Sequence, residues 1–582
     1  MRNPISAFKT KAGNKAVVNT LVARGKKVMR ELDTNSRNAE KISDDLLLRI
    51  LEENKDTEYG KKYDFENIHS YEEYREKVPF SAYDDYEPYI KRMIENDEKN
   101  LISVYEPKHY ALSSGSVGVP KHIPVSQAEL DKYSKYGAAM AFGVADEFYR
   151  TTMGKGLPPG RGLNALELRP MQTKNGIPKG PISSTILSSH KDAIPYLVTS
   201  PWSVICTDNG DIIDMKYLKT RIALEQKDVA FMESAFMPGM VDLIDYMKEH
   251  YEMICSDIYH GRINKEIKMP AGLRKELEAR MIPDRTRAAR LMREFKKGFD
   301  TPIIPRIWPK LAWIGGIGTG GFFTYANKMR KYTGKNIPFN NLTYAASESL
   351  VATARHMGDT SYVLIPDGGF YEFIPAKNEY EPGKEETLTI KDLEIGEDYE
   401  IVLTNLSGFY RYRINDVVRV MGFYNECPMI TFIYRKNQLL SIAGEKTNEE
   451  AVRWSVEQFM KDTGLTVTDY SVYADTDDEP GHYVILMEPD HIVKKKDIEY
   501  YREAIEKRLM QANPSYGMKI NTGVLGKTEL IFVQQETYML YRDLMIMKGV
   551  SPDQLKPVRV IDTPIKEKFF FGLVEDSYED DE

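Results

Sequence analysis

Cysteine and closely spaced histidines are scarce in this sequence of 582 residues. The three cysteines are Cys206, Cys255 and Cys427, and no two of them form a Cys-x-x-Cys pair. So few cysteines in a long chain indicate a reducing compartment, and we expect a cytoplasmic protein. The nine histidines include neither a His-x-His nor a His-Glu-x-x-His pattern, so no zinc site of that kind is predicted.

Long apolar runs and an excess of positive charge are also missing. No apolar run reaches the roughly 18 residues of a membrane span, so no membrane partner is expected. The chain has 79 Lys and Arg against 87 Asp and Glu, a net charge of −8 that gives no electrostatic case for nucleic acid. The basic first thirty residues could mimic a transit peptide, but their apolar spacing favours an ordinary helix. We take a monomer as the default.

The stretch from residue 113 to residue 121 has the composition of a loop that cradles phosphate. Its glycines permit close approach of the backbone, its serines supply hydroxyl groups, and its lysine supplies positive charge. It is not a Walker A loop, because the strand-like residues Ile123–Val125 follow it instead of a helix. The next helix is predicted to begin at a capping box formed by Ser126 and Glu129. We therefore predict the tip of a hairpin, although a plain turn between strands would fit the composition equally well.

The stretch Thr343–Ser349 places an aromatic ring, small residues and a carboxylate at the end of a predicted strand. This combination suits a nucleotide, because the ring offers a surface, the small residues allow close approach, and Glu348 offers an oxygen to Mg²⁺. A serine and a glutamate at a strand end are also ordinary helix-capping residues, so the motif alone is not specific.

The stretch Gly408–Asp416 alternates aromatic and basic residues. A strand would place its two tyrosines on one face and its two arginines on the other. Asp416 follows at a predicted turn, where it would accept hydrogen bonds from a ribose diol. A solvated strand with an aspartate at its turn is the alternative.

Two further features could contribute to a ligand site. The predicted strand Leu311–Ile314 ends in the glycine-rich turn Gly315–Gly321, which lacks the helix and acidic residue of a dinucleotide fold. The long predicted helix Gln127–Arg150 has a face of small and apolar residues that could line an apolar pocket, although core packing is the commoner use of such a face.

Residues 216–260 are predicted to be helical throughout.

The character of the sequence changes near Arg435. Downstream, the pattern reads helix, strand, strand, helix, strand, helix, which is typical of a small α/β domain. We therefore predict two domains, residues 1–436 and residues 437–582.

Taken together, these motifs resemble the auxin-responsive Gretchen Hagen family of acyl-acid amido synthetases, which belongs to the adenylate-forming enzymes. The resemblance covers nearly the whole chain. Ser113–Lys121 is similar to the family's phosphate loop, although one hydroxyl and one glycine of the usual pattern are missing. Tyr344–Glu348 resembles the second motif, Ser407–Asp416 the third, and Gln554–Arg559 the segment that carries the adenylation lysine.

The resemblance implies a fold and a reaction. The fold is α/β, with a large N-terminal adenylate-forming domain of sheets, helices and a barrel-like part, and a small mobile C-terminal α/β domain. In the reaction, a carboxylic acid attacks the α-phosphate of ATP with Mg²⁺, and an amine, usually an amino acid, then displaces AMP to give an amide. Transfer to coenzyme A or a hydroxyl, and a nucleotide-binding relative without catalysis, are the alternatives.

The resemblance also implies roles for single residues. Lys556 and Glu348 are the implied catalytic residues, and Glu348 is the implied Mg²⁺ ligand. Met140, Arg169 and Gly318 fall where the family builds its acid and amine sites, although a surface salt bridge is an equal alternative for Arg169. The residues implied to bind ATP or AMP are Ser113, Ser114, Gly115, Ser116, Gly118, Lys121, Thr319, Tyr344, Ala345, Ala346, Ser347, Phe370, Asp416 and Arg435.

Overall fold

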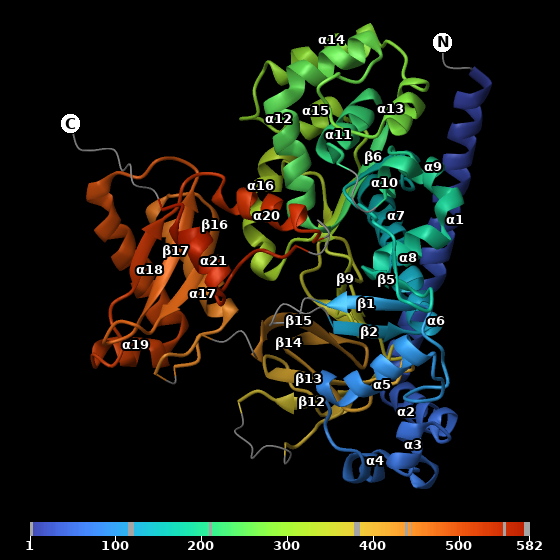
Figure 1. Cartoon of the computed structure of the whole chain (residues 1–582), viewed down its shortest axis with the longest axis vertical. Helices are drawn as coiled ribbons and strands as arrows, with labels where there is room; N and C mark the ends of the chain where they lie inside the picture. The colour runs from blue at the N-terminus through green and yellow to red at the C-terminus, as the bar shows by residue number, and fades with distance from the viewer. Residues whose placement is uncertain are drawn as a thin grey trace. The chain divides into compact units, whose positions relative to one another are not determined.

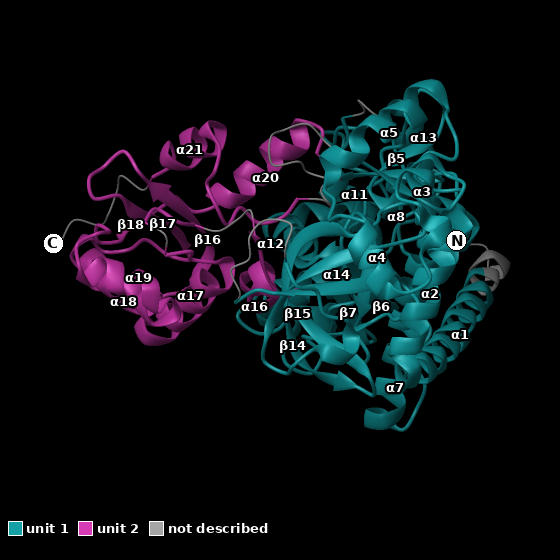
Figure 2. Ribbon diagram, turned by 90° about the horizontal axis from the view of Figure 1, so that it is seen from below, with its two compact units in different colours: residues 1–317, 329–432 teal, residues 318–328, 433–582 magenta. Residues whose placement is uncertain are grey.

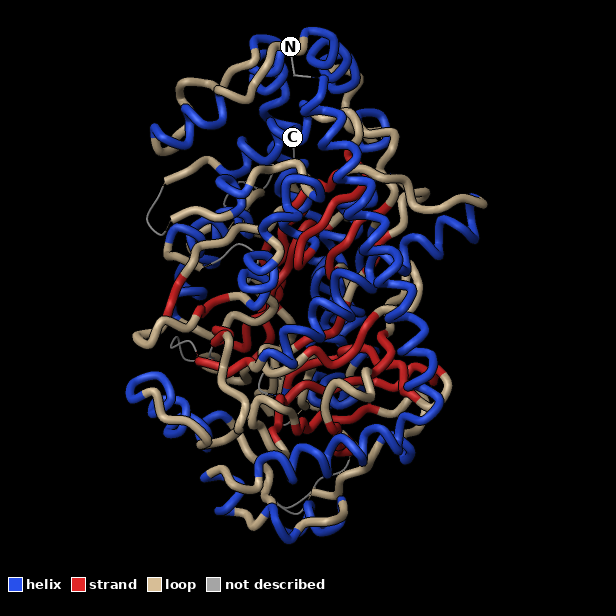
Figure 3. The backbone as a smooth tube through the Cα atoms, turned by 90° about the vertical axis from the view of Figure 1, so that its right-hand side faces the viewer, coloured by secondary structure: helices blue, strands red, loops and turns tan. Residues whose placement is uncertain are grey.

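The computed structural model describes residues 4–113, 121–208, 212–377, 385–436, 440–443, 445–550 and 555–574. It divides into two compact units, which Figure 2 shows in different colours. The first comprises residues 1–317 and 329–432, and the second comprises residues 318–328 and 433–582. Helices surround several sheets (Figure 3), and the predicted α/β fold class is confirmed.

The helices of the first unit lie largely where apolar side chains recur every three or four residues. α2 (Ala39–Asn54), for example, buries Leu46 and Ile50 on one face. Figure 1 shows α1 (Pro4–Asn35) as one long helix, as the apolar spacing predicted. The other helices of the region before residue 334 are α3 (Glu58–Lys62), α4 (Tyr71–Lys77), α5 (Tyr83–Asn96), α8 (Ile182–Ser189), α9 (Ile194–Leu197), α10 (Trp202–Ile205), α11 (Met215–Glu225), α12 (Met237–His260), α13 (Ala271–Glu278), α14 (Arg285–Phe295), α15 (Ile304–Ile307) and α16 (Phe323–Thr333).

The long helix predicted after residue 126 consists of three joined segments. They are α6 (Gln127–Lys132), a π-helical segment at Tyr133–Ala139, and α7 (Met140–Met153). Ser126 caps the first turn as predicted, because its hydroxyl accepts the backbone N–H of Glu129. The reciprocal half of the predicted capping box is not formed, since the backbone N–H of Ser126 donates instead to the hydroxyl of Ser407 at 3.1 Å.

Three sheets are described in the first unit. The largest is antiparallel in its described pairings, with strand order β12-β13-β14-β15-β11-β10-β9, and a parallel sheet has the order β3-β6-β7-β8. A smaller sheet has the order β2-β1-β5-β4. The strands are β1 (His109–Ser113), β2 (Lys121–Val125), β3 (Arg161–Asn164), β4 (Met171–Gln172), β5 (Pro178–Gly180), β6 (Val229–Phe236), β7 (Trp313–Ile317), β8 (Phe339–Asn340), β9 (Thr343–Ala345), β10 (Leu350–Thr353), β11 (Tyr362–Leu364), β12 (Phe370–Pro375), β13 (Asp398–Thr404), β14 (Tyr412–Tyr424) and β15 (Cys427–Arg435).

The prediction of uninterrupted helix over residues 216–260 is wrong. β6 separates α11 from α12 and pairs in parallel with β3 and β7. Its first four residues are all buried. A parallel strand covered on both faces has a continuous apolar run, so its periodicity does not distinguish it from a buried helix.

The second unit contains a three-stranded sheet with the order β16-β17-β18, and the segment 318–328 belongs to this unit. Its core includes Phe459 from the first helix after residue 448 and Ile485 from the central strand. The order of elements after residue 448 follows the predicted one, with α19 and α21 added. The elements are α17 (Glu449–Thr463), β16 (Val467–Asp475), β17 (His482–Pro489), α18 (Ile498–Ala512), α19 (Pro514–Asn521), β18 (Glu529–Phe532), α20 (Thr537–Met547) and α21 (Pro564–Phe571).

Candidate active site

The predicted phosphate loop joins two antiparallel strands, as a hairpin requires. Ser113 ends β1 and pairs with Lys121, which begins β2. The ammonium nitrogen of Lys121 lies 5.0 Å from the centre of the Tyr83 ring. The backbone N–H of His122 donates to the Tyr83 hydroxyl at 3.0 Å. The predicted phosphate-binding residues that lie outside the described part of the chain are Ser114, Gly115, Ser116 and Gly118.

The second and third motifs meet through two hydrogen bonds between side chains. The hydroxyl of Tyr344, in β9, donates to Oδ2 of Asp416 at 2.8 Å. The hydroxyl of Tyr412, at the start of β14, donates to Oε1 of Glu348 at 3.0 Å. Glu348 is half-buried, whereas Tyr344, Tyr412 and Asp416 are buried. The structure therefore joins the second motif to the third through two separate hydrogen bonds, one at the predicted Mg²⁺ ligand and one at the predicted ribose ligand.

The prediction that Asp416 lies at a turn is wrong, because this residue lies inside β14. Arg413 pairs with Val402 and Val417 pairs with Glu400, so β14 has two extra residues between these pairs. Asn415, within this bulge, has a left-handed backbone with φ of 61°. A bulge re-aims the side chains next to it. The bulge accounts for the direction of the Asp416 carboxylate, which accepts the hydrogen bond of Tyr344.

The predicted alternation of tyrosines and arginines before Asp416 is interrupted. Arg411 has a φ of 45°, and β14 begins only at the next residue. The Arg411 guanidinium forms a buried ion pair with Glu372 at 2.9 Å and donates to two backbone carbonyls. Arg411 is therefore a core residue that fixes the start of β14, because a buried charge is retained only where it is paired.

Asn405 connects the turn before β14 to the second motif. Its Oδ1 accepts the backbone N–H groups of Ser407 and Phe409 at 3.0 and 3.2 Å. Its Nδ2 donates to the backbone carbonyl of Glu348 at 2.9 Å. Sequence reasoning missed this residue, and its only signal was a polar side chain directly after a strand.

A buried ion pair on α6 supports the turn that carries Glu348. The ammonium of Lys132 lies 2.6 Å from Glu129 and donates to the Ser349 hydroxyl at 3.0 Å. The Ser349 hydroxyl donates to Glu129 at 3.1 Å. Burial raises the pKa of Glu129, and the adjacent Lys132 opposes this shift. The Tyr133 hydroxyl donates to the carbonyl of Ala346 at 3.0 Å, so one helix contacts the turn at both ends.

Several other residues predicted for the site, Gly318, Thr319, Arg435 and Lys556, lie in the second unit. Thr319 precedes a turn of 3₁₀ helix at Gly320–Phe322, and Gly318 precedes Thr319. Arg559 donates to the carbonyl of Gly321 and forms an ion pair with Asp469, so it ties this turn to β16.

Glu449 lies beside the glycine-rich turn and is influenced by several positive charges of the second unit. Its Oε1 lies 2.5 Å from the position that a Cβ atom would take on Gly321. Burial raises the pKa of Glu449, and the positive charges of Arg559, Lys556 and Arg435 lower it. Within the second unit, the partly exposed Glu449 therefore contacts the glycine-rich turn and feels the charges of Arg435 and the exposed Lys556.

Three models of GH3 family domains match the chain. The GH3 family N-terminal domain matches residues 28–339, the central domain residues 362–435, and the C-terminal domain residues 449–565. The chain belongs to the GH3 family. The family resemblance expected from the motifs is confirmed.

Named relatives of this GH3 chain are amido synthetases and a benzoates-glutamate ligase. Probable indole-3-acetic acid-amido synthetase GH3.1 of Arabidopsis thaliana is 29% identical over 571 residues, which cover 93% of this chain and 92% of the relative. The 4-substituted benzoates-glutamate ligase GH3.12 of Arabidopsis thaliana is 29% identical over 577 residues, which cover 93% of this chain and 98% of the relative. The solved structure of GH3.15 acyl acid amido synthetase has a TM-score of 0.82 at 26% identity, and the match covers 94% of this chain and 96% of that structure. The predicted enzyme class is confirmed.

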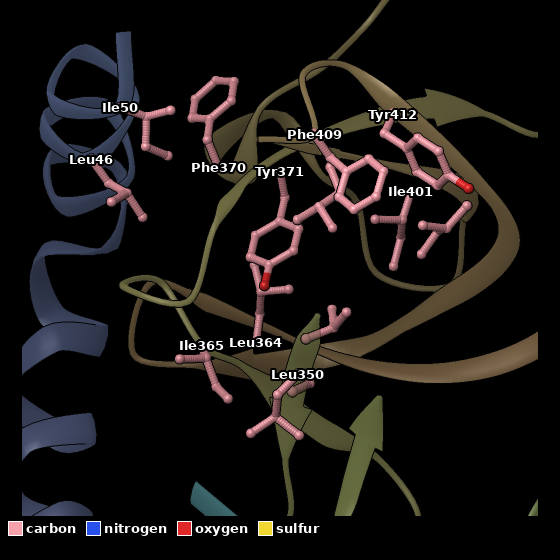
Figure 4. Close-up of a cluster of buried hydrophobic side chains, with 14 of the residues drawn as sticks. Leu46, Ile50, Leu350, Leu364, Ile365, Phe370, Tyr371, Ile401, Phe409 and Tyr412 are labelled. Atoms are coloured by element: carbon pink, nitrogen blue, oxygen red, sulfur yellow. The ribbon is translucent and has the colours of Figure 1, made fainter. Parts of the chain in front are cut away.

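Two residues predicted at the ligands, Phe370 and Met140, are buried in this structure, and their contact with a ligand stays a prediction. Phe370 is 1% exposed and lies 5.5 Å, between ring centres, from Tyr71. Figure 4 shows it beside Ile50 of α2, within the buried cluster. Met140 is also 1% exposed and belongs to the same cluster. Both side chains pack against neighbours in the core. For Met140, this is the packing that was given above as the alternative use of the apolar face of its helix.

Other predicted residues lie nearer the surface. Ala345 is exposed at the end of β9, and Ala346 and Ser347 are half-buried in the turn that follows it. Arg169 is half-buried after β3, and its pairing with a substrate carboxylate stays a prediction. Within the described residues, no helix is long and apolar enough to cross a membrane.

Proposed function

We propose that this GH3 protein uses ATP to activate a small carboxylic acid and joins the acyl group to an amino acid. One observation carries the proposal. The second and third motifs meet through two hydrogen bonds between residues 64 and 72 positions apart, in which Tyr412 donates to Glu348 and Tyr344 donates to Asp416. The names of the relatives, which include an indole-3-acetic acid-amido synthetase, support the amide product.

The site has a side chain suited to Mg²⁺. Glu348 is a half-buried carboxylate whose Oε1 accepts a hydrogen bond and whose backbone is held by Asn405. Mg²⁺ commonly binds one or two carboxylates together with substrate phosphates and water, so one such carboxylate fits. When bound, the ion would neutralise negative charge on the phosphates of ATP. Tyr412 and Asn405 would orient Glu348 for this role.

In the first half-reaction, a carboxylate oxygen of the acid attacks the α-phosphorus of ATP, and the bond to pyrophosphate breaks. The ammonium of Lys556 would stabilise the negative charge that develops on the phosphate oxygens. Asp416, positioned by Tyr344, would accept hydrogen bonds from the ribose hydroxyls. Lys121 and the backbone of the hairpin would bind the phosphates.

In the second half-reaction, the ammonium of the amino acid first releases one proton to water. The neutral nitrogen then attacks the acyl carbon, the bond to the AMP oxygen breaks, and the nitrogen releases a second proton to water. We propose that the small domain predicted at residues 437–582, which falls within the second unit, moves between the two half-reactions. Such a motion would also keep water from the reactive acyl-adenylate. We further propose that the protein is cytoplasmic, because the three cysteines are unpaired, as is typical of a reducing compartment. A monomer is proposed as the default oligomeric state.

The first test is acid-dependent exchange of labelled pyrophosphate into ATP, with a panel of carboxylic acids and no amine. Exchange with at least one acid is expected for the wild type. Lys556→Ala is expected to abolish exchange but to retain ATP binding, measured by calorimetry. Lys548→Ala removes another exposed lysine of the second unit and is expected to exchange like the wild type.

The same experiment can overturn the proposal in two ways. Undiminished exchange in Lys556→Ala would remove the lysine from the mechanism. ATP binding without exchange for any acid would favour a nucleotide-binding protein without catalysis. Exchange followed by transfer to coenzyme A or a hydroxyl, detected by mass spectrometry of the product, would replace the amide with a thioester or ester.

A further inference from the structure

Glu233 lies on the central part of the parallel sheet, near the carboxyl end of β6. Its backbone pairs with Asn164 of β3 on one side and with Gly315 of β7 on the other. Asn164 is the last residue of β3, whereas Gly315 is the middle residue of β7, so the position lies in the carboxyl-terminal half of the sheet. In open parallel sheets, ligands bind outside the carboxyl ends of the strands. Glu233 is therefore placed where this type of sheet receives a ligand.

The Glu233 carboxyl group has no protein partner within the described residues. It forms no hydrogen bond and no ion pair there, although the side chain is only partly exposed. Burial alone raises its pKa to about 7. A desolvated carboxylate costs free energy unless an opposite charge or a donor accompanies it. Groups kept in this condition are enriched at functional sites.

The surroundings of Glu233 include an aromatic pair and a glycine of the neighbouring strand. Two residues before it, Phe231 stacks on Trp313 of β7 with ring centres 5.2 Å apart. Beside it, a Cβ atom on Gly315 would lie 2.7 Å from the Trp313 ring, 3.3 Å from Leu342 and 3.5 Å from Cγ of Glu233. The glycine thus lets the Trp313 ring and the stem of Glu233 pack closely, at the end of an aromatic surface.

Glu233 also lies close to the chain segment that carries Tyr344 and Glu348. Leu342, which approaches the same point beside Gly315, immediately precedes β9. β9 leads through Tyr344 to the turn that holds Glu348. A ligand beside Glu233 would therefore occupy the edge of the parallel sheet that adjoins this segment.

We propose that Glu233 binds the ammonium group of a substrate. The proposal rests on the proposed function and names the chemistry of one of its two substrates. A cationic nitrogen would supply the opposite charge that no described residue provides, and charge-assisted hydrogen bonds of this type are among the strongest. The ammonium belongs either to the amino acid acceptor or to an amino-substituted acid.

Separate assays of the two half-reactions distinguish these sources. Glu233→Gln keeps the size of the side chain but removes its negative charge. If the ammonium belongs to the acceptor, this variant shows normal pyrophosphate exchange but a KM for the amine raised at least tenfold. If it belongs to the acid, the KM of amino-substituted acids in the exchange assay rises at least tenfold, while that of acids without the amino group is unchanged.

Glu249→Gln, which changes an exposed glutamate on α12, serves as the matched control and should leave both constants unchanged. KM values within twofold of the wild type for every acid and amine, in a folded Glu233→Gln variant, would overturn the proposal. If the wild type shows no exchange at all, the proposed function fails, and calorimetric titration with amino acids then decides on Glu233. Equal binding by the wild type and Glu233→Gln would overturn the ammonium site in that case.

Discussion

Tyr412 shows how one hydroxyl group can serve a site from within the core. Its ring packs against Phe409 and Tyr86, with ring centres 4.7 and 6.0 Å away, while its hydroxyl reaches Glu348. Burial and the nearby Glu348 raise the pKa of the Tyr412 hydroxyl, so it stays protonated and remains a donor. Removing the oxygen alone would therefore leave the packing but release the carboxylate.

Tyr412→Phe is expected to raise the Mg²⁺ concentration for half-maximal pyrophosphate exchange about tenfold and to lower stability by about 1 kcal/mol, the usual worth of one hydrogen bond. A Mg²⁺ titration of exchange and urea denaturation measure the two effects. Tyr110→Phe is the control, because the buried Tyr110 hydroxyl has no hydrogen-bond partner among the described residues. An unchanged Mg²⁺ requirement in Tyr412→Phe would contradict the assigned role of the hydroxyl.

The pKa of Glu233 predicts how stability depends on pH. Because this pKa is raised to about 7 in the folded protein, the unfolded chain releases the proton at lower pH. The folded state therefore loses relative stability as pH rises from about 4.5 to about 7. Glu233→Gln lacks this loss, so its stability advantage over the wild type should grow from pH 5 to pH 8 by up to about 3 kcal/mol. Denaturation at both pH values tests this, and a constant difference would argue against the raised pKa.

At the scale of elements, α6 and the turn after β9 behave as one structure. Lys132 is 12% exposed and contacts Glu129 and Ser349, so the helix and the turn share a buried polar network. Breaking a buried ion pair from one side leaves an uncompensated charge, which costs more than removing both partners.

Lys132→Met is expected to destabilise the protein by about 3 kcal/mol at neutral pH, because Glu129 would be left buried without its cation. The double variant Lys132→Met with Glu129→Gln is expected to recover part of that loss. Guanidinium denaturation of both variants measures the difference. Equal destabilisation by the two variants would show that the ion pair itself contributes little.

The same elements show how far sequence reasoning reaches. The hairpin at residues 113–121 and the strand end at Tyr344 were predictable, because glycines, strand runs and motif residues are local signals. β6 was missed, since its apolar run has no period that separates strand from helix. The pairing of Glu129 with Ser349 was also beyond reach, because 220 residues separate them and only the fold brings them together. For the same reason, Phe370 and Met140 could be placed on elements but not assigned to the core.

At the scale of the whole molecule, the segment 318–328 has a structural role that its place in the sequence conceals. It follows β7 of the first unit directly, yet it belongs to the second unit. Arg559 holds the carbonyl of Gly321, and the Tyr325 hydroxyl donates to Asp469, which also pairs with Arg559. The predicted nucleotide turn is therefore attached to the unit that carries Lys556.

Arg559→Lys tests this attachment, because lysine keeps the charge but lacks the forked geometry that lets arginine contact Gly321, Asp469 and the Tyr470 carbonyl together. Amide hydrogen exchange in residues 318–328 is expected to become at least tenfold faster in this variant, while the central strand β17 keeps its protection. Arg508→Lys, which alters a more exposed pair with Asp462, should leave the segment unchanged. Unchanged exchange in Arg559→Lys would mean that other contacts hold the turn, and that motion of the second unit need not carry it along.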